Sequence, residues 1–190
     1  MINFSKLKKA APIFGYLSNL IDYPSKTTFS LKRYQQLKQG YPNTSQKKEL
    51  LKMIKKLQQE NLLEQQSHYT GLFEMNQRYT LYMTYYKLTD SRERGVVLAK
   101  LKMLYEMFGV SISGNELADY LPLILEFLSI ADFEADPRKQ DLQLAIQVVE
   151  NGTYELLKNA VIEIEDPYFQ LIQIIRNELK SCIGMEAKVR

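Results

Sequence analysis

Apolar residues recur along the chain mainly at the three-to-four-residue spacing of amphipathic helices. The most apolar segment covers residues 113–132. One helical face of this segment is made of Leu117, Leu121, Ile124, Leu125 and Leu128. Leu123 and Phe127 lie on another face, and a helix that is apolar nearly all round is normally enclosed by other helices. The pattern predicts a short turn near 114–118 and a buried helix over about 120–131.

Two capping signals precede this buried helix. Ser113 and Glu116 have the spacing of a capping box. Asp119 can cap a second start just before Pro122, which is tolerated in a first helical turn because its missing N–H has no intrahelical partner there.

The remaining apolar patterns predict further helices separated by Gly, Pro, Asn and Asp. These helices are expected over residues 4–20, 27–38, 45–63, 72–88, 91–108, 137–150, 153–165 and 167–182. Gly95 is expected to mark a close backbone approach, and Asn151-Gly152 to separate two helices. A strand over 79–86 is the alternative for the aromatic segment, since Tyr and Thr favour sheets. The length of that segment and its helical neighbours favour a helix.

These elements together predict an all-α single domain, a multi-helix bundle over residues 1–183, with a frayed tail over 184–190. The chain of 190 residues is 45% hydrophobic, which is enough for a core. The sequence has no run of 18 apolar residues, so no membrane span is predicted. The N-terminus lacks the apolar core of a signal peptide. The single cysteine, Cys182, excludes an internal disulfide and fits a reducing cytosol, so we expect a cytoplasmic protein.

Charge is distributed unevenly along the chain. Residues 1–60 hold twelve Lys/Arg and three acids, whereas residues 110–170 hold twelve acids and three basic residues. Two interpretations stay open: the two regions attract each other or are simply solvated, or the acidic region receives a basic ligand. The lysine-rich helix over 45–63 is typical of a solvated face on a packed helix, although such helices also lie on membranes or nucleic acids.

The sequence offers no chemistry for an enzyme. No two glycines are close enough for a Gly-x-Gly-x-x-Gly loop, and one His with one Cys cannot build a metal cluster. His68 lies in a polar run and is expected at the surface, while Cys182 is expected in the core. We therefore predict a non-catalytic protein that carries no metal and no other cofactor.

Two short motifs carry a family resemblance. The segment Asp119-Tyr-Leu-Pro-Leu-Ile-Leu-Glu-Phe-Leu128 resembles the signature of the nitrate reductase molybdenum cofactor assembly chaperones, the delta-subunit family. Tyr120 stands where this family commonly has His. The segment Ser91-Arg-Glu-Arg-Gly95 resembles the family's Ser-Arg-Asp-Arg-Gly. The four motif residues expected to have structural roles are Arg92, Arg94, Gly95 and Pro122.

The resemblance implies a chaperone that binds the apo catalytic (alpha) subunit of a respiratory nitrate reductase through its N-terminal segment, until the molybdenum cofactor is inserted. Proteins of cofactor biosynthesis are further candidate partners. A client helix with an apolar face needs a groove of adaptable apolar side chains, which Met and Tyr supply, and acids can meet its basic residues. The candidate groove residues are Tyr79, Tyr82, Tyr86, Asp119, Tyr120, Leu121, Leu123, Glu126 and Phe127.

Several alternatives remain at this point. Each candidate groove residue could instead belong to the core or cap a helix. The chain could be a generic all-helical peptide-binding adaptor, or a nucleic-acid-binding protein that uses its basic N-terminal third. The sequence shows no helix-turn-helix spacing and no RNA-binding aromatic motif, and its C-terminal acids oppose polyanion binding, so we expect no nucleic-acid partner.

Overall fold

The computed structural model describes residues 1–184 and confirms the predicted all-α architecture: within this range there are nine α-helices and no strand longer than an isolated bridge. The α-helices are α1 (Phe4–Ile21), α2 (Leu31–Gly40), α3 (Lys47–Leu57), α4 (Leu62–Tyr69), α5 (Tyr85–Leu88), α6 (Arg92–Met107), α7 (Leu121–Ile130), α8 (Leu142–Asn159) and α9 (Pro167–Ser181). Three shorter turns, a π turn and two 3₁₀ turns, are η1 (Thr70–Glu74), η2 (Gln77–Tyr79) and η3 (Lys139–Asp141). The predicted frayed tail lies, apart from Gly184, outside the described residues.

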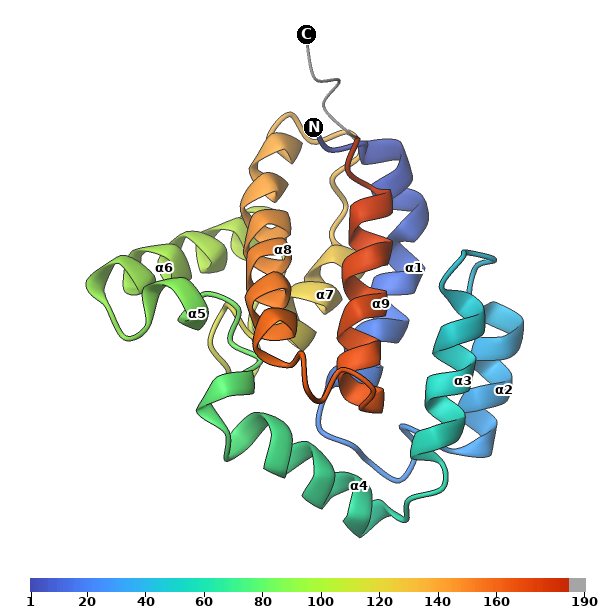
Figure 1. The fold of residues 1–190 in the computed structure, drawn as a ribbon. Helices are drawn as coiled ribbons and strands as arrows, with labels where there is room; N and C mark the ends of the chain where they lie inside the picture. Colours follow the sequence, from blue (N-terminus) through green and yellow to red (C-terminus); the bar gives the residue numbers. More distant parts are fainter. Residues whose placement is uncertain (185–190) are drawn as a thin grey trace, which may run out of the picture.

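The core is built around α1, α7, α8 and α9 (Figure 1). The short α7 lies inside the bundle along α1, and α9 packs against α1, α3 and α8. Most of the α7 side chains are buried: Leu121, Pro122, Ile124, Leu125, Phe127 and Leu128. The prediction of an enclosed helix over about 120–131 is therefore confirmed.

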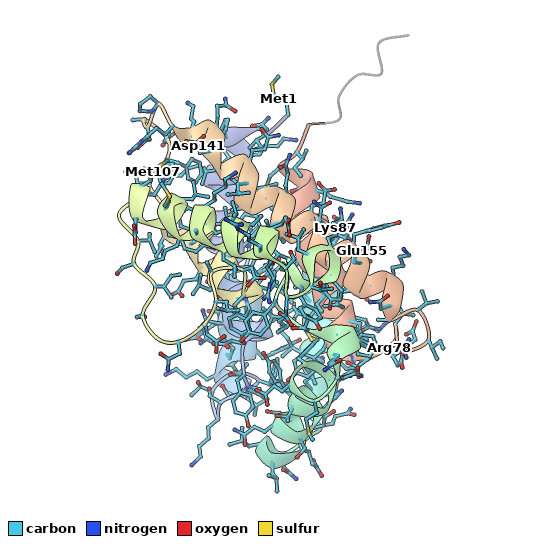
Figure 2. All side chains as sticks on the ribbon, turned by 90° about the vertical axis from the view of Figure 1, so that its left-hand side faces the viewer. Met1, Arg78, Lys87, Met107, Asp141 and Glu155 are labelled. Carbon is cyan, nitrogen blue, oxygen red and sulfur yellow. The ribbon has the colours of Figure 1, made fainter. Side chains whose placement is uncertain are left out.

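Two helical pairs extend from this core on opposite sides. The α2–α3 hairpin lies on one side, and α5 with α6 lies on the other (Figure 1). Viewed from the side of α6, that helix crosses in front of α8, with Met107 toward Asp141 (Figure 2). Both residues line one shallow recess between the two helices. None of the helices in the described part of the chain is long and apolar enough to cross a membrane.

Polar side chains close several helix starts. Asn3, Ser30, Asn61, Ser91 and Asp166 each accept a backbone N–H at the start of a helix. The helix expected over 167–182 begins as predicted, because Asp166 caps α9 and proline occupies its first turn, whereas the helix expected from 137 begins only at Leu142. These caps satisfy N–H groups that would otherwise lack partners.

The aromatic segment is the largest error of the prediction. Residues 72–88 do not form one helix but pass through η1, η2, an extended stretch and the short α5. The extended stretch pairs Tyr82 with Tyr120 in an isolated antiparallel bridge. The tyrosines of this segment have helical spacing in the sequence, but they do not lie on one helical face. Tertiary contacts bury their rings instead, and these contacts override the local pattern.

The predicted break at Asn151-Gly152 is also wrong. α8 continues through both residues, and the stretch after Asn159 is a loop, so no separate helix covers 153–165. A β-carbon at position 152 would lie 2.6 Å from the carbonyl oxygen of Met83. Glycine is present because the backbone before α5 approaches α8 closely, whereas a β-carbon at Gly95 would meet nothing within 4 Å. The close approach that we expected at Gly95 thus occurs at Gly152.

Smaller corrections concern helix ends. The helix predicted over 45–63 ends at Leu57, and a second helix, α4, begins at Leu62. Ser113 and Glu116 lie in a loop and cap no helix. α7 starts after Tyr120 without a side-chain cap, because Asp119 points elsewhere.

Candidate functional site

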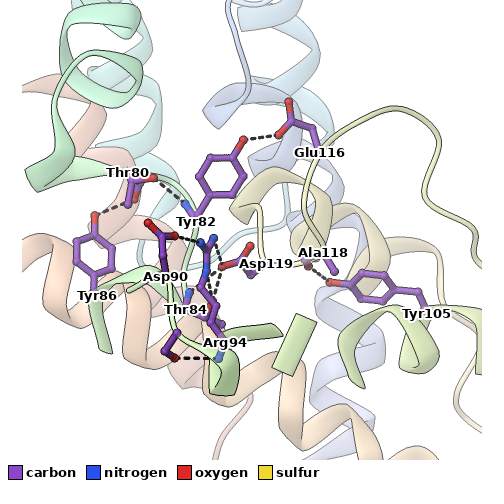
Figure 3. A network of polar contacts seen from close by, with 11 residues as sticks. Thr80, Tyr82, Thr84, Tyr86, Asp90, Arg94, Tyr105, Glu116, Ala118 and Asp119 are labelled. Atoms are coloured by element: carbon purple, nitrogen blue, oxygen red, sulfur yellow. Dashed lines mark hydrogen bonds and ion pairs between the residues drawn. The ribbon is translucent and has the colours of Figure 1, made fainter. Parts of the chain in front are cut away.

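The two sequence motifs meet in the structure through a buried ion pair (Figure 3). Ser91 caps α6 and so places Arg94 in its first turn. The Arg94 guanidinium lies 3.3 Å from Asp119 Oδ2 and 3.2 Å from Asp90 Oδ1. Thr84 completes the cluster, since its backbone N–H donates to Asp119 Oδ2 at 3.1 Å and its hydroxyl accepts from Arg94 Nε at 3.1 Å. Asp119 is fully buried, so this cluster fixes the start of α6 against the residues before α7.

Backbone pairing brings two tyrosines together beside this cluster. The N–H of Met83 donates to Asp119 O at 3.0 Å, and the N–H of Leu121 donates to Leu81 O at 2.9 Å. The residues between these bonds, Tyr82 and Tyr120, have ring centroids 5.5 Å apart. The bridge thus holds both rings side by side without a sheet.

These rings form part of a pocket of about 470 Å³ between the end of α4, α5, α6 and the loop before α7. Its lining comprises Tyr69, Phe73, Glu74, Asn76, Gln77, Thr80, Leu81, Tyr82, Tyr85, Arg94, Glu116, Leu117 and Tyr120. We call it the tyrosine pocket. Its size and mixed lining suit a few side chains of a peptide, because apolar surface supplies affinity and a few polar groups supply orientation.

Hydrogen bonds hold the tyrosine hydroxyls and acids at the rim. Tyr82 donates to Glu116 at 2.7 Å (Figure 3), and Tyr120 donates to Asp22 at 3.0 Å. Tyr69 and Tyr120 share a further hydroxyl–hydroxyl bond of 3.0 Å. Burial, with a contribution from the bond to Glu116, raises the pKa of Tyr82 to about 12. Burial also raises the pKa of Tyr120, so both phenols stay neutral donors to carboxylates near neutral pH.

The rim of the tyrosine pocket is acidic. Glu74 and Glu116 line the pocket, where Glu116 accepts a phenol hydrogen bond and Glu74 accepts from Thr70 at 2.8 Å. Asp22 lies next to this lining, because it accepts from the Tyr120 hydroxyl. None of these three carboxylates makes an ion pair with another residue within the described range 1–184. A cationic group entering the pocket would therefore find unpaired negative charge and aromatic faces, both of which attract cations.

The structure divides the predicted groove residues into several groups. Tyr82 and Tyr120 line the tyrosine pocket, together with the motif residue Arg94. Tyr79 and Leu121 are core residues. Tyr86 is partly buried and is not part of the pocket lining, and its hydroxyl donates to Thr80 O at 2.7 Å. Asp119 is buried in the ion-pair cluster, where it positions Arg94 rather than offering its own charge to solvent.

The last three predicted residues lie on another recess. Leu123, Glu126 and Phe127 line a small cavity of about 110 Å³ beneath the loop that follows α6. Phe127 is buried, and Glu126 is exposed. The predicted set does not form one continuous groove, because successive positions of α7 point to different sides of the bundle. A role for any of these residues in peptide binding stays a prediction.

The remaining motif residues have simpler environments. Arg92 is exposed at the first position of α6. Pro122 lies in the first turn of α7, and its carbonyl oxygen accepts a hydrogen bond from Ser18 Oγ at 2.8 Å. Pro122 therefore helps to join α7 to α1.

Sequence reasoning missed several lining residues of the tyrosine pocket. Tyr69, Phe73 and Tyr85 come from three different elements and share no short motif. The π turn η1 brings Phe73 back beside Tyr69, with ring centroids 5.1 Å apart. The only available signal was the abundance of tyrosine, thirteen residues in the chain.

Two other titratable residues lie outside the tyrosine pocket. His68 bridges Glu60 at 3.1 Å and Asp166 at 2.7 Å. We predicted a surface position for His68, but its side chain is partly buried. The hydrogen bond with Asp166 raises the pKa of His68 to about 9 against the opposing effect of burial. Cys182 is buried as predicted, and burial raises the pKa of its thiol. Within residues 1–184 no three His, Cys, Asp or Glu side chains converge on a metal-sized site.

Comparison with known proteins gives consistent matches. The family model for the nitrate reductase delta subunit matches residues 38–159, which is more than half of the chain. The probable nitrate reductase molybdenum cofactor assembly chaperone NarJ of Bacillus subtilis (strain 168) is 35% identical over 126 residues, covering 64% of this chain and 67% of that protein.

Two further relatives match over shorter stretches. The nitrate reductase molybdenum cofactor assembly chaperone NarJ of Escherichia coli (strain K12) is 34% identical over 67 residues, 35% of this chain and 28% of that protein. The nitrate reductase-like protein NarX of Mycobacterium tuberculosis (strain ATCC 25618 / H37Rv) is 32% identical over 85 residues, 45% of this chain and 13% of that protein. The chain thus spans two thirds of the Bacillus relative but less than a third of the other two.

Proposed function

Since this chain belongs to the nitrate reductase delta subunit family, we propose that it is a nitrate reductase molybdenum cofactor assembly chaperone. Its client is the apo catalytic (alpha) subunit of a respiratory nitrate reductase, which it binds through the N-terminal segment of that subunit in the cytoplasm. Chaperones of this family are not catalysts, which agrees with the prediction that the chain is not an enzyme.

The observation that carries the proposal is the family match over residues 38–159. This range contains both sequence motifs, the buried pair of Arg94 and Asp119 that joins them, and every lining residue of the tyrosine pocket. The pocket is therefore the part of the molecule in which we place client binding.

The chemistry of the tyrosine pocket suits a segment that is both apolar and basic. Tyr82, Tyr85, Tyr120 and Leu117 offer apolar surface, and burying one large client side chain there is worth roughly 1.5–3 kcal/mol. The rim acids can meet basic client residues, but exposed ion pairs contribute only about 0–1 kcal/mol each. Apolar contact should therefore dominate affinity, and added salt should weaken binding modestly.

Calorimetric titration of a synthetic N-terminal peptide of the alpha subunit into the purified chain tests this proposal. A matched pair of variants locates the site. Leu117 is 41% exposed in the tyrosine pocket, and Ile130 is 58% exposed at the other recess. Leu117→Ala should weaken binding by roughly tenfold, because a buried aliphatic contact is lost. Ile130→Ala should leave affinity unchanged.

A second matched pair tests the acidic rim. Glu116→Gln should weaken binding by about two- to fivefold, as expected for one exposed charge pair. Glu126→Gln should have no effect, because Glu126 lines the separate small recess. Absence of any binding at about 100 µM protein, where a Kd near 10 µM would be detected, would refute peptide recognition by this chain. Equal losses of peptide affinity in the two members of each matched pair would show that the peptide does not bind in the tyrosine pocket.

A further inference from the structure

The segment from Lys26 to Lys56 is the most strongly charged part of the molecule. It contains the loop before α2, α2 itself and all of α3 except its last residue, and we call it the basic hairpin. It holds nine Lys/Arg and a single acid, Glu49, a net charge of +8, whereas the whole chain carries only +3. The client-binding proposal makes no use of this charge.

The cations of the basic hairpin are almost all unpaired. Lys52 lies 3.8 Å from Glu49, and the other eight basic side chains make no ion pair within residues 1–184. On α3 the apolar face is buried, so Lys48, Lys52 and Lys55 form an exposed stripe on the opposite face. Only the single exposed pair of Lys52 with Glu49 offsets mutual repulsion along this stripe, which points to an anionic partner.

Exposed leucines accompany these lysines at one end of the basic hairpin. Leu31, the first residue of α2, is 74% exposed, and Leu63, in the first turn of α4, is 72% exposed. Leu31 lines one open recess together with Lys26 and Leu62. The nearby acids are already engaged, Glu60 with His68 and Glu64 in the capping box of α4.

We propose that the basic hairpin docks the protein on an anionic phospholipid surface. Its lysines would meet lipid phosphates, and Leu31 and Leu63 would enter the boundary between headgroups and acyl chains. Exposed leucines gain free energy at such a boundary but have no partner on a nucleic-acid backbone. Docking would be peripheral, because no described helix can span a bilayer. The basic hairpin lies opposite α5 and α6 (Figure 1), so the tyrosine pocket would stay accessible on the bilayer-bound protein.

Flotation of the purified chain with vesicles tests this inference independently of client binding. The chain should bind vesicles of equal parts phosphatidylglycerol and phosphatidylcholine at about 50 mM salt and dissociate from them at about 500 mM salt. It should not bind vesicles of pure phosphatidylcholine. The triple variant Lys48→Gln, Lys52→Gln, Lys55→Gln should bind about 100-fold more weakly, since one lysine near an anionic bilayer is worth about 1 kcal/mol, or about fivefold. Leu31→Ser with Leu63→Ser should weaken binding about tenfold or more.

The control is a second triple variant, which removes the same number of charges outside the basic hairpin. Lys100→Gln, Lys102→Gln, Lys180→Gln alters exposed lysines outside the basic hairpin and should lower vesicle binding less than fivefold. Equal loss in both triple variants would overturn the inference, because net charge alone would then explain binding. Absence of vesicle binding would also overturn it, as would tighter binding to a short DNA duplex that the hairpin variant abolishes. Both triple variants should keep the client-peptide affinity of the natural chain.

Discussion

Arg94 and Asp119 are the residues through which the two motifs act on each other. Asp119 is fully buried, and its Oδ1 atom has no hydrogen-bond partner within residues 1–184. The hydrogen-bonding capacity of this buried pair is therefore only partly used. The stability of the folded protein depends on keeping both charges together. Removing one partner leaves the other as an uncompensated buried charge.

Arg94→Met should lower the free energy of unfolding by about 3–5 kcal/mol, because Asp119 would lose its counter-charge. Urea unfolding followed by circular dichroism gives this quantity. Arg92→Met, two residues earlier and exposed, is the control and should stay within about 0.5 kcal/mol of the natural chain. Similar losses in the two variants would show that the ion pair contributes little.

His68 links three elements, because it lies on α4 and bridges the turn after α3 to the N-cap of α9. Its pKa rises from 6.5 to about 9 in the folded protein. Stability from this bridge is fully present below pH 6.5 and is lost as the pH rises through 9, since the folded state binds the proton more tightly. Between pH 6 and 10 the free energy of unfolding should fall by roughly 2 kcal/mol more in the natural chain than in His68→Gln. Parallel pH profiles for the two proteins would contradict the assigned bridge.

Replacing glycine by alanine should have opposite effects on folding stability at two positions within helices. Gly152→Ala should destabilise the protein by about 1–3 kcal/mol despite the better helix propensity of alanine, because the new β-carbon would meet the Met83 backbone at 2.6 Å. Gly95→Ala, on α6, should stabilise by about 0.5–1 kcal/mol, since nothing lies within 4 Å. Thermal unfolding of both variants measures the difference, and destabilisation by Gly95→Ala would refute the described open environment.

Helices with their own start signal could be predicted from sequence, whereas segments shaped by distant contacts could not. Asp166 and Pro167 identify the start of α9 locally. Gly152 resembles a helix break because its tertiary reason, the approach of Met83, comes from residues far away in the chain. The tyrosine pocket has the same difficulty: its walls come from α4, η1, α5 and the loop before α7, and only Tyr82 and Tyr120 belonged to the predicted groove.

On the scale of the whole molecule, a single direct ion pair joins the basic and acidic regions of the sequence within the described residues. Lys8 with Asp132, at 3.3 Å and largely exposed, is the one direct Lys/Arg–carboxylate pair between residues 1–60 and 110–170 in the described part of the chain. Such a pair contributes little. Attraction between the two regions, one of the interpretations left open by the sequence, therefore lacks a structural basis in specific pairs.

Salt should accordingly stabilise this protein. Raising sodium chloride from about 50 to 500 mM should increase the melting temperature by a few degrees, because it screens repulsion within the basic hairpin more than it weakens the few exposed pairs. The variant Lys48→Gln, Lys52→Gln, Lys55→Gln should melt higher at low salt and respond less to added salt. A fall in melting temperature with salt would indicate that attractive pairs dominate instead.

The sparse anchoring of α6 has a dynamic consequence. Only four of its sixteen residues are buried, namely Arg94, Leu101, Leu104 and Tyr105. A helix held at so few points should open as a unit at a free energy below that of global unfolding, so its amides should exchange with deuterium sooner than those of α1 or α9. Arg94 also lines the tyrosine pocket, so an occupant of that pocket would slow exchange along the whole of α6. The helix would then report occupancy at amides that no ligand touches.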